Sequence, residues 1–128
     1  MKLEHVAINV PDSVAMAAWY VENLDMKVVI STNSAPFMHF LADKNEESMI
    51  EIYSNTSAPL PDYAAMLPSM LHFAFNVDDM EATRQRLIAA GATPEGEVSN
   101  TARGDQLAFL RDPWNIVIQL VKRSKPLL

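Results

Sequence analysis

Apolar and polar residues alternate along several short stretches of the chain, a pattern typical of β-strands with one buried face. In the stretch 3–10, for example, Val6, Ile8 and Val10 alternate with small or polar residues. Comparable runs cover about 26–32, 37–43 and 49–54, and then about 71–77, 95–99, 106–112 and 115–122. The pattern predicts eight strands in two groups of four.

A segment with helical spacing follows the first strand of each group. Asp12 or Ser13 is placed to cap a helix over about 13–24. The apolar residues that partly follow helical spacing there are Val14, Trp19, Val21 and Leu24, and Met16 is interpreted as core filler. This segment therefore predicts one amphipathic helix packed on the first group of strands.

The second helical segment has clearer end signals. Asp78 with Glu81 three residues later matches a capping box, and Gly91 suits the position just after a helix. Met80, Leu87 and Ile88 fall on one face, and the polar side carries Arg84, Gln85 and Arg86. We expect a helix between these two end signals.

The two groups repeat one another in sequence. HVAINVPD (5–12) matches HFAFNVDD (72–79), HFLAD (39–43) matches AFLRD (108–112), and SMIEIYS (48–54) matches IVIQLVK (116–122). The repeat predicts an α+β fold of two βαβββ modules, about 1–56 and 70–123, within a single domain, 1–128. The proline-rich segment SAPLPDYAAMLPSM between them is interpreted as a linker.

Composition narrows the classes of function. The chain has 128 residues, 49% of them apolar, and a net charge of −6 without a basic stripe, which argues against nucleic acid as a partner. No apolar run is long enough to span a membrane, and the N-terminus lacks a secretory pattern, so we expect a cytoplasmic protein. Without cysteine, any metal site must use nitrogen and oxygen ligands.

Strand parity places four candidate metal ligands on the side of each sheet away from its helix. If the alternate apolar residues of each strand pack under the helix, His5 and Glu51 in the first module and His72 and Gln119 in the second point to the other side. A single histidine or glutamate at a strand is usually an ordinary surface residue. The joint pattern, at equivalent positions of a duplicated unit, favours a metal site.

Other polar residues have more than one interpretation. His39 corresponds to Ala108 in the repeat, and the parity of its strand is not fixed by the sequence, so it is interpreted as structural or pocket-lining rather than as a ligand. Arg103 and Arg111 could contact an anionic substrate, but an arginine at a strand end is usually solvated.

These motifs resemble the vicinal oxygen chelate superfamily, which includes glyoxalase I, methylmalonyl-CoA epimerase, extradiol dioxygenases and the fosfomycin and bleomycin resistance proteins. HVAINVPD, MIEIYS, LHFAFNVDD and FLRDPWNIVIQL carry the resemblance, the last being similar to the family's Asp-Pro-Asp-Gly-Asn turn and final ligand strand. The resemblance implies an incomplete eight-stranded barrel, a small-molecule substrate and a homodimer.

The resemblance also implies a ligand set for one divalent ion, Zn, Ni, Mn, Co or Fe. Glyoxalase I uses His or Gln, Glu, His and Glu, which fall here on His5, Glu51, His72 and Gln119, so the last position departs from the pattern. The epimerase uses His, Gln, His and Glu, the same inventory with the two halves exchanged. One carboxylate instead of two leaves one positive charge uncompensated, and Glu51 is then the catalytic base.

The expected activity is that of a metal-dependent lyase or isomerase of glyoxalase I type, acting on a small α-oxo or thiol-adduct substrate through an enediolate. The alternatives are an epimerase-like isomerase, or a non-catalytic protein that binds a small molecule such as an antibiotic. A binding protein would stack its ligand on Trp19, Tyr53 or Trp114. The substrate, the ion, and whether the site lies within one subunit or across a dimer stay open.

Overall fold

The computed structural model describes residues 1–128, which divide into two compact units, Met1–Pro61 (unit 1) and Asp62–Leu128 (unit 2). Unit 1 contains β1 (Val6–Asn9), α1 (Ser13–Asn23), β2 (Lys27–Ser31), β3 (His39–Ala42) and β4 (Met49–Tyr53). Unit 2 contains the 3-10 helix η1 (Tyr63–Ala65), β5 (Phe73–Asn76), α2 (Met80–Ala89), β6 (Thr93–Asn100), β7 (Gln106–Arg111) and β8 (Val117–Lys122). The predicted α+β class with two βαβββ modules is confirmed.

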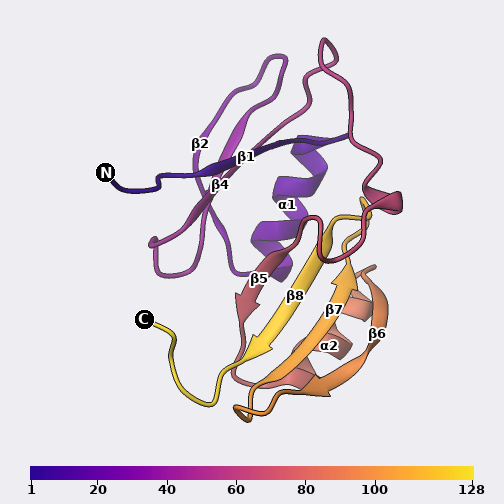
Figure 1. Ribbon diagram of the computed structural model, residues 1–128. Coiled ribbons are helices and arrows are strands. Elements are labelled where there is room, and N and C mark those ends of the chain that lie inside the picture. The colour runs from indigo at the N-terminus through magenta and orange to yellow at the C-terminus, as the bar shows by residue number, and fades with distance from the viewer. The chain divides into compact units, whose positions relative to one another are not determined.

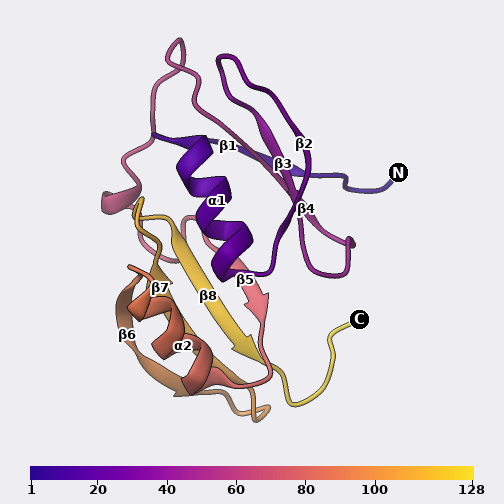
Figure 2. The same cartoon turned by 180° about the vertical axis from the view of Figure 1, so that it is seen from behind.

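Each unit forms one four-stranded sheet, ordered β1-β4-β3-β2 in unit 1 and β5-β8-β7-β6 in unit 2. The first and fourth strands of each module pair in parallel, and the other neighbours are antiparallel. Helix α1 contacts β2, β3 and β4, and α2 contacts β7 and β8. The helix α2 lies behind its sheet in Figure 1 and in front of it in Figure 2. One face of each sheet is therefore the helix face, and the opposite one is called here the non-helix face.

Alternating apolar residues of the strands build the core on the helix face. In unit 1 these include Leu41 and Ile52, both fully buried, and in unit 2 Ile118 and Leu120, which are equally inaccessible. Burying side chains of this size is the main favourable term in folding, about 1.5–3 kcal/mol each. Val6, expected in this core, is instead exposed, because it lies at the start of an edge strand.

Helix α1 buries a different face from the one its apolar residues suggested. Its buried positions are Ser13, Met16, Ala17, Tyr20 and Asn23, which follow helical spacing, whereas Val14 is 52% exposed. The two polar residues tolerate burial because Ser13 donates to the carbonyl of Phe37 and Asn23 donates to that of Trp19. Hydrogen bonding thus overrides side-chain hydropathy here.

Both helices begin at an aspartate, but the second cap is one residue later than predicted. Asp12 Oδ1 accepts from Ala15 N, as expected, whereas the cap of α2 is Asp79 and not Asp78. The predicted capping box is wrong, because Glu81 accepts from Gln85 within the helix instead of closing back on the cap. Gly91 does follow the helix, with a positive φ of 105° that favours glycine.

The segment between the modules is more ordered than a plain linker. Residues Tyr63–Ala65 form η1, capped by Asp62, and the ring of Tyr63 is only 5% exposed. Its second half therefore packs as part of unit 2 rather than only connecting the units. None of the helices combines the length and apolar character that crossing a bilayer requires.

A buried carboxylate fastens the last residues of the chain to unit 2. Asp105 is 1% exposed and accepts hydrogen bonds from the backbone N–H and the hydroxyl of Ser124 and from Arg123 Nη1. The Ser124 backbone N–H, followed by the Arg123 guanidinium, lowers the pKa of Asp105 from 3.8 to about 2. Asp105 therefore contributes stability in its ionised form.

We expect Asp105 to make stability depend on acid. Because its pKa is lower in the folded chain than in the unfolded one, its contribution is complete above pH 3.8 and is lost as the pH falls through about 2. Asp105→Asn should lower the free energy of unfolding at pH 7, and the gap to the parent protein should narrow in acid. Urea unfolding at several pH values measures this, with Asp78→Asn as control. A gap of constant size from neutral pH to pH 2 would contradict it.

Candidate metal centre

The register of each sheet places the predicted ligands on the non-helix face. In unit 1, Ala7 of β1 lies beside Glu51 of β4, and in unit 2, Ala74 of β5 lies beside Gln119 of β8. The neighbouring residue Ile52 points to the helix face and is fully buried. His5 and His72 each lie two residues before these alanines, so they share the same side of their strands.

In unit 1 the imidazole of His5 meets the carboxylate of Glu51. His5 Nδ1 lies 2.9 Å from Glu4 Oε1, and His5 Nε2 lies 3.4 Å from Glu51 Oε2. The Glu51 side chain is 19% exposed. An ionised Glu4 only accepts, so Nδ1 carries a proton, and the Nε2 atom facing Glu51 needs either a second proton or a cation between the two. Two donor atoms on a tetrahedral zinc ion at about 2.1 Å would lie about 3.4 Å apart, which matches this geometry.

In unit 2 the ring of His72 has a comparable arrangement with a different partner. His72 Nδ1 lies 2.7 Å from the carbonyl oxygen of Pro68. A carbonyl oxygen only accepts, so Nδ1 carries the proton and Nε2 keeps its lone pair. Metal-binding histidines commonly donate their other ring N–H to a carbonyl or carboxylate in this way. His72 is thus prepared to bind an ion through Nε2.

Phenylalanine packs edge to face against each of these two histidines. The rings of His5 and Phe40 are 5.0 Å apart at 89°, and those of His72 and Phe109 are 5.6 Å apart at 86°. Phe40 and Phe109 are also the cross-strand neighbours of Glu51 and Gln119.

The duplication therefore extends to the packing around the candidate ligands. The sequence reasoning missed both phenylalanines, although Phe40 and Phe109 match one another when HFLAD is aligned with AFLRD.

His39 lies on the other side of the sheet from these groups. Its cross-strand partner is Ile52, so it points to the helix face, and its Nδ1 donates to the carbonyl of Phe37. This register settles the parity that the sequence left open. His39 has a structural role beside the start of α1, where Ser13 donates to the same carbonyl.

The donor chemistry fits a divalent ion of intermediate hardness, with two imidazoles, one carboxylate and one amide oxygen. Each unit contributes one histidine and one oxygen donor to the predicted set. No group of three or more His, Asp or Glu side chains that could hold a metal is found in the structure. The pair formed by His5 and Glu51 is therefore the one part of the predicted set whose geometry is directly defined.

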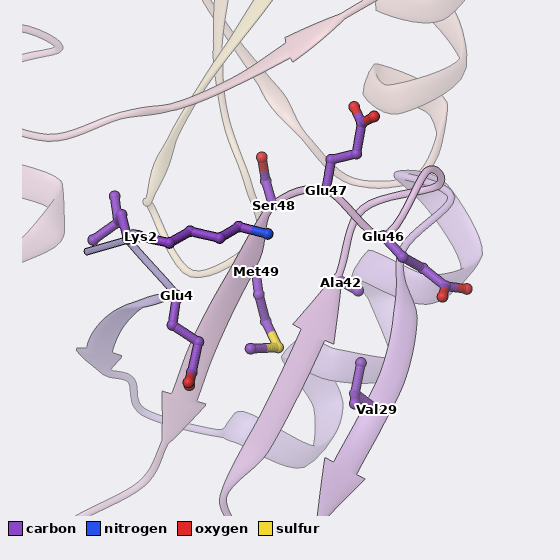
Figure 3. Close-up of a pocket in the computed structure, with 9 residues that line it drawn as sticks. Lys2, Glu4, Val29, Ala42, Glu46, Glu47, Ser48 and Met49 are labelled. Atoms are coloured by element: carbon purple, nitrogen blue, oxygen red, sulfur yellow. The ribbon is translucent and has the colours of Figure 1, made fainter.

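A shallow hollow of about 400 Å³ also lies in unit 1 and contains none of the four predicted ligands. It is lined by Lys2, Leu3, Glu4, Val29, Ala42, Glu46, Glu47, Ser48 and Met49. Figure 3 shows the N-terminal residues on one side of it and the turn before β4 on the other. Its charged rim is partly neutralised, because Glu46 accepts from Lys27. Through Glu4 the hollow adjoins His5 without including it.

The family model of the Glyoxalase/Bleomycin resistance protein/Dioxygenase superfamily matches residues 2–120. The chain belongs to this superfamily, as its motifs suggested. No curated protein matches the sequence.

Solved structures with the same fold carry different functions in their names. SMU.1112c is 29% identical with a TM-score of 0.74, and the match covers 95% of this chain and 98% of that one. A glyoxalase I mutant from Zea mays is 22% identical with a TM-score of 0.76, covering 97% of this chain and 46% of the maize chain. TnmS3, an antibiotic-binding protein from Streptomyces, is 20% identical with a TM-score of 0.72, covering 97% of both chains. The likeness to the last two shows the fold alone.

Two histidine variants test which face of the unit 1 sheet binds metal. We expect His5→Ala to weaken Zn²⁺ or Ni²⁺ binding at least about tenfold, because it removes a ligand. His39→Ala, on the helix face of the same sheet, should leave the affinity within about twofold. Calorimetric titration of both variants measures this, and an equal loss in the two would contradict the assignment.

Proposed function

We propose that the protein is a metal-dependent lyase or isomerase of glyoxalase type, acting on a small α-oxo or thiol-adduct substrate through an enediolate. The observation that carries the proposal is the contact between His5 Nε2 and Glu51 Oε2, which lie 3.4 Å apart on the non-helix face. Membership of the superfamily supports it. A cytoplasmic location and a homodimer, both expected from the sequence, belong to the same proposal.

One divalent ion, Zn, Ni, Mn, Co or Fe, would be held by His5 and Glu51 of unit 1 and His72 and Gln119 of unit 2. The four donors would come from one chain or from two chains of a dimer. Such an ion, when bound, polarises the neighbouring oxygens of the substrate and stabilises the negative charge that develops on them. His5 and His72 are suited to this role because each carries its proton on Nδ1.

Glu51 is the group proposed to move the proton. Its carboxylate is mostly buried and lies beside Phe40, its cross-strand neighbour, which limits the access of water. The equivalent position in unit 2 is Gln119, whose amide cannot accept and return a proton at neutral pH. Removal of a proton from the substrate carbon and its return would therefore both use Glu51.

Glu51→Gln tests this role directly. Loss of a general base should lower kcat by about 10²- to 10⁴-fold, while the fold is retained because the amide has the same shape. Glu47→Gln, which changes an exposed carboxylate of the same unit, is the matched control. The assays compare the methylglyoxal–thiol adduct with a 2-methylmalonyl thioester, so that they also separate a lyase from an epimerase. Undiminished turnover of the better substrate by Glu51→Gln would contradict the proposal.

The second candidate function is the binding of a small molecule without catalysis, which the likeness to the antibiotic-binding TnmS3 favours. Among the aromatic residues expected to stack a ligand, Tyr53 lies on the non-helix face, two residues along β4 from Glu51. Trp19 lies on α1, and Trp114 lies in the turn before β8. Ligand binding that is equally tight with and without metal, together with no turnover of either substrate, would favour this candidate.

A further inference from the structure

Arg111 at the end of β7 has all of its N–H groups engaged. Its Nε and Nη2 donate to the two carboxylate oxygens of Glu95, at 2.6 and 3.1 Å. Nη1 donates to the carbonyls of Tyr63 and Asn115, at 2.9 and 3.1 Å, and Nη2 also donates to that of Met66, at 2.8 Å. A guanidinium has five N–H donors, and these contacts use all five.

This arrangement excludes both roles that the sequence suggested for Arg111. The side chain is 13% exposed, so it is not solvated, and it has no N–H left for an anionic substrate. The carboxylate of Glu95 raises the pKa of Arg111, and the guanidinium in turn lowers the pKa of Glu95, so both groups are charged at neutral pH. The contacts are therefore structural in kind, and their targets show what they hold.

Two of those targets belong to the segment 62–70, which leads directly into β5. Arg111 binds the carbonyls of Tyr63, at the start of η1, and of Met66, just after it. The segment then turns, with Met70 N donating to the carbonyl of Leu67. Arg111 thus joins the end of β7 to the backbone that precedes the second module.

The same segment supplies the group that orients His72. Pro68 lies two residues after Met66, and its carbonyl accepts from His72 Nδ1 at 2.7 Å. The equivalent His5 instead uses the side chain of Glu4, its immediate neighbour, which is 74% exposed. His5 is therefore oriented by a local contact, whereas His72 is oriented by a backbone carbonyl whose place depends on tertiary structure.

We propose that Arg111 is a positioning residue for His72. By holding the carbonyls of Tyr63 and Met66, it fixes segment 62–70 so that the Pro68 carbonyl keeps the His72 proton on Nδ1 and leaves Nε2 able to bind an ion. Without this contact the ring is free to carry its proton on Nε2, where the proton blocks coordination. The metal-binding consequence rests on the proposed function, but the orientation of the ring does not.

The test is the tautomer of His72 in the metal-free protein, measured by long-range ¹H–¹⁵N NMR of the imidazole rings at one pH above the histidine range. In the parent protein we expect His72 to carry its proton on Nδ1. In Arg111→Gln we expect a mixture of tautomers at His72, no change at His5, and a fall in Zn²⁺ affinity of about 10- to 100-fold.

Arg123→Gln is the matched control, because it breaks the contact of another arginine with a carboxylate in unit 2 without touching segment 62–70. It should lower stability while leaving both tautomers and the Zn²⁺ affinity unchanged. If Arg111→Gln folds and its His72 spectrum and Zn²⁺ affinity equal those of Arg123→Gln, the inference is wrong.

If Arg111→Gln does not fold, Glu95→Gln decides the question, because it removes only the charge that holds the guanidinium in place. It should shift the His72 tautomer in the same direction by a smaller amount, and an unchanged tautomer would overturn the inference. A parent protein that binds no Zn²⁺ would sink the proposed function, whereas the NMR result would still decide the role of Arg111.

Discussion

Parallel pairing of the first and fourth strands within each unit is the constraint on which the candidate site depends. It places Ala7 beside Glu51 and Ala74 beside Gln119, so that a histidine near the start of each module shares a face with the oxygen donor of its last strand. A parallel pair needs a long crossover connection, which the helix and the two intervening strands supply. A slip of one residue in either pairing would turn Glu51 or Gln119 toward the helix.

The two modules keep this geometry but differ in chemistry. Glu51 carries a charge where Gln119 does not, and His5 is oriented by a flexible side chain where His72 is oriented by the Pro68 carbonyl. The shared contacts with phenylalanine preserve the ring positions in both. A duplicated unit has thus kept its scaffold while one half acquired the group suited to proton transfer and the other a more rigid ligand.

Strand parity and the internal repeat predicted much of this site, because side chains alternate strictly between the faces of a sheet and a repeat doubles every signal. The same reasoning could not place His39, whose face depends on the register with Ile52. It also chose the wrong face of α1, where buried Ser13 is held by a hydrogen bond to a distant carbonyl. The role of Arg111 was equally hidden, because its partners come from a segment that sequence composition marks only as a linker.

The central claim is that the donors of both modules bind one ion. NMR of the protein with one equivalent of paramagnetic Co²⁺ per chain tests it most directly, because only coordinated imidazoles show large contact shifts. The account predicts strongly shifted ring signals from both His5 and His72 at that ratio, and none from His39. Shifts from only one of the two rings, or a requirement for two ions per chain before both respond, would contradict it.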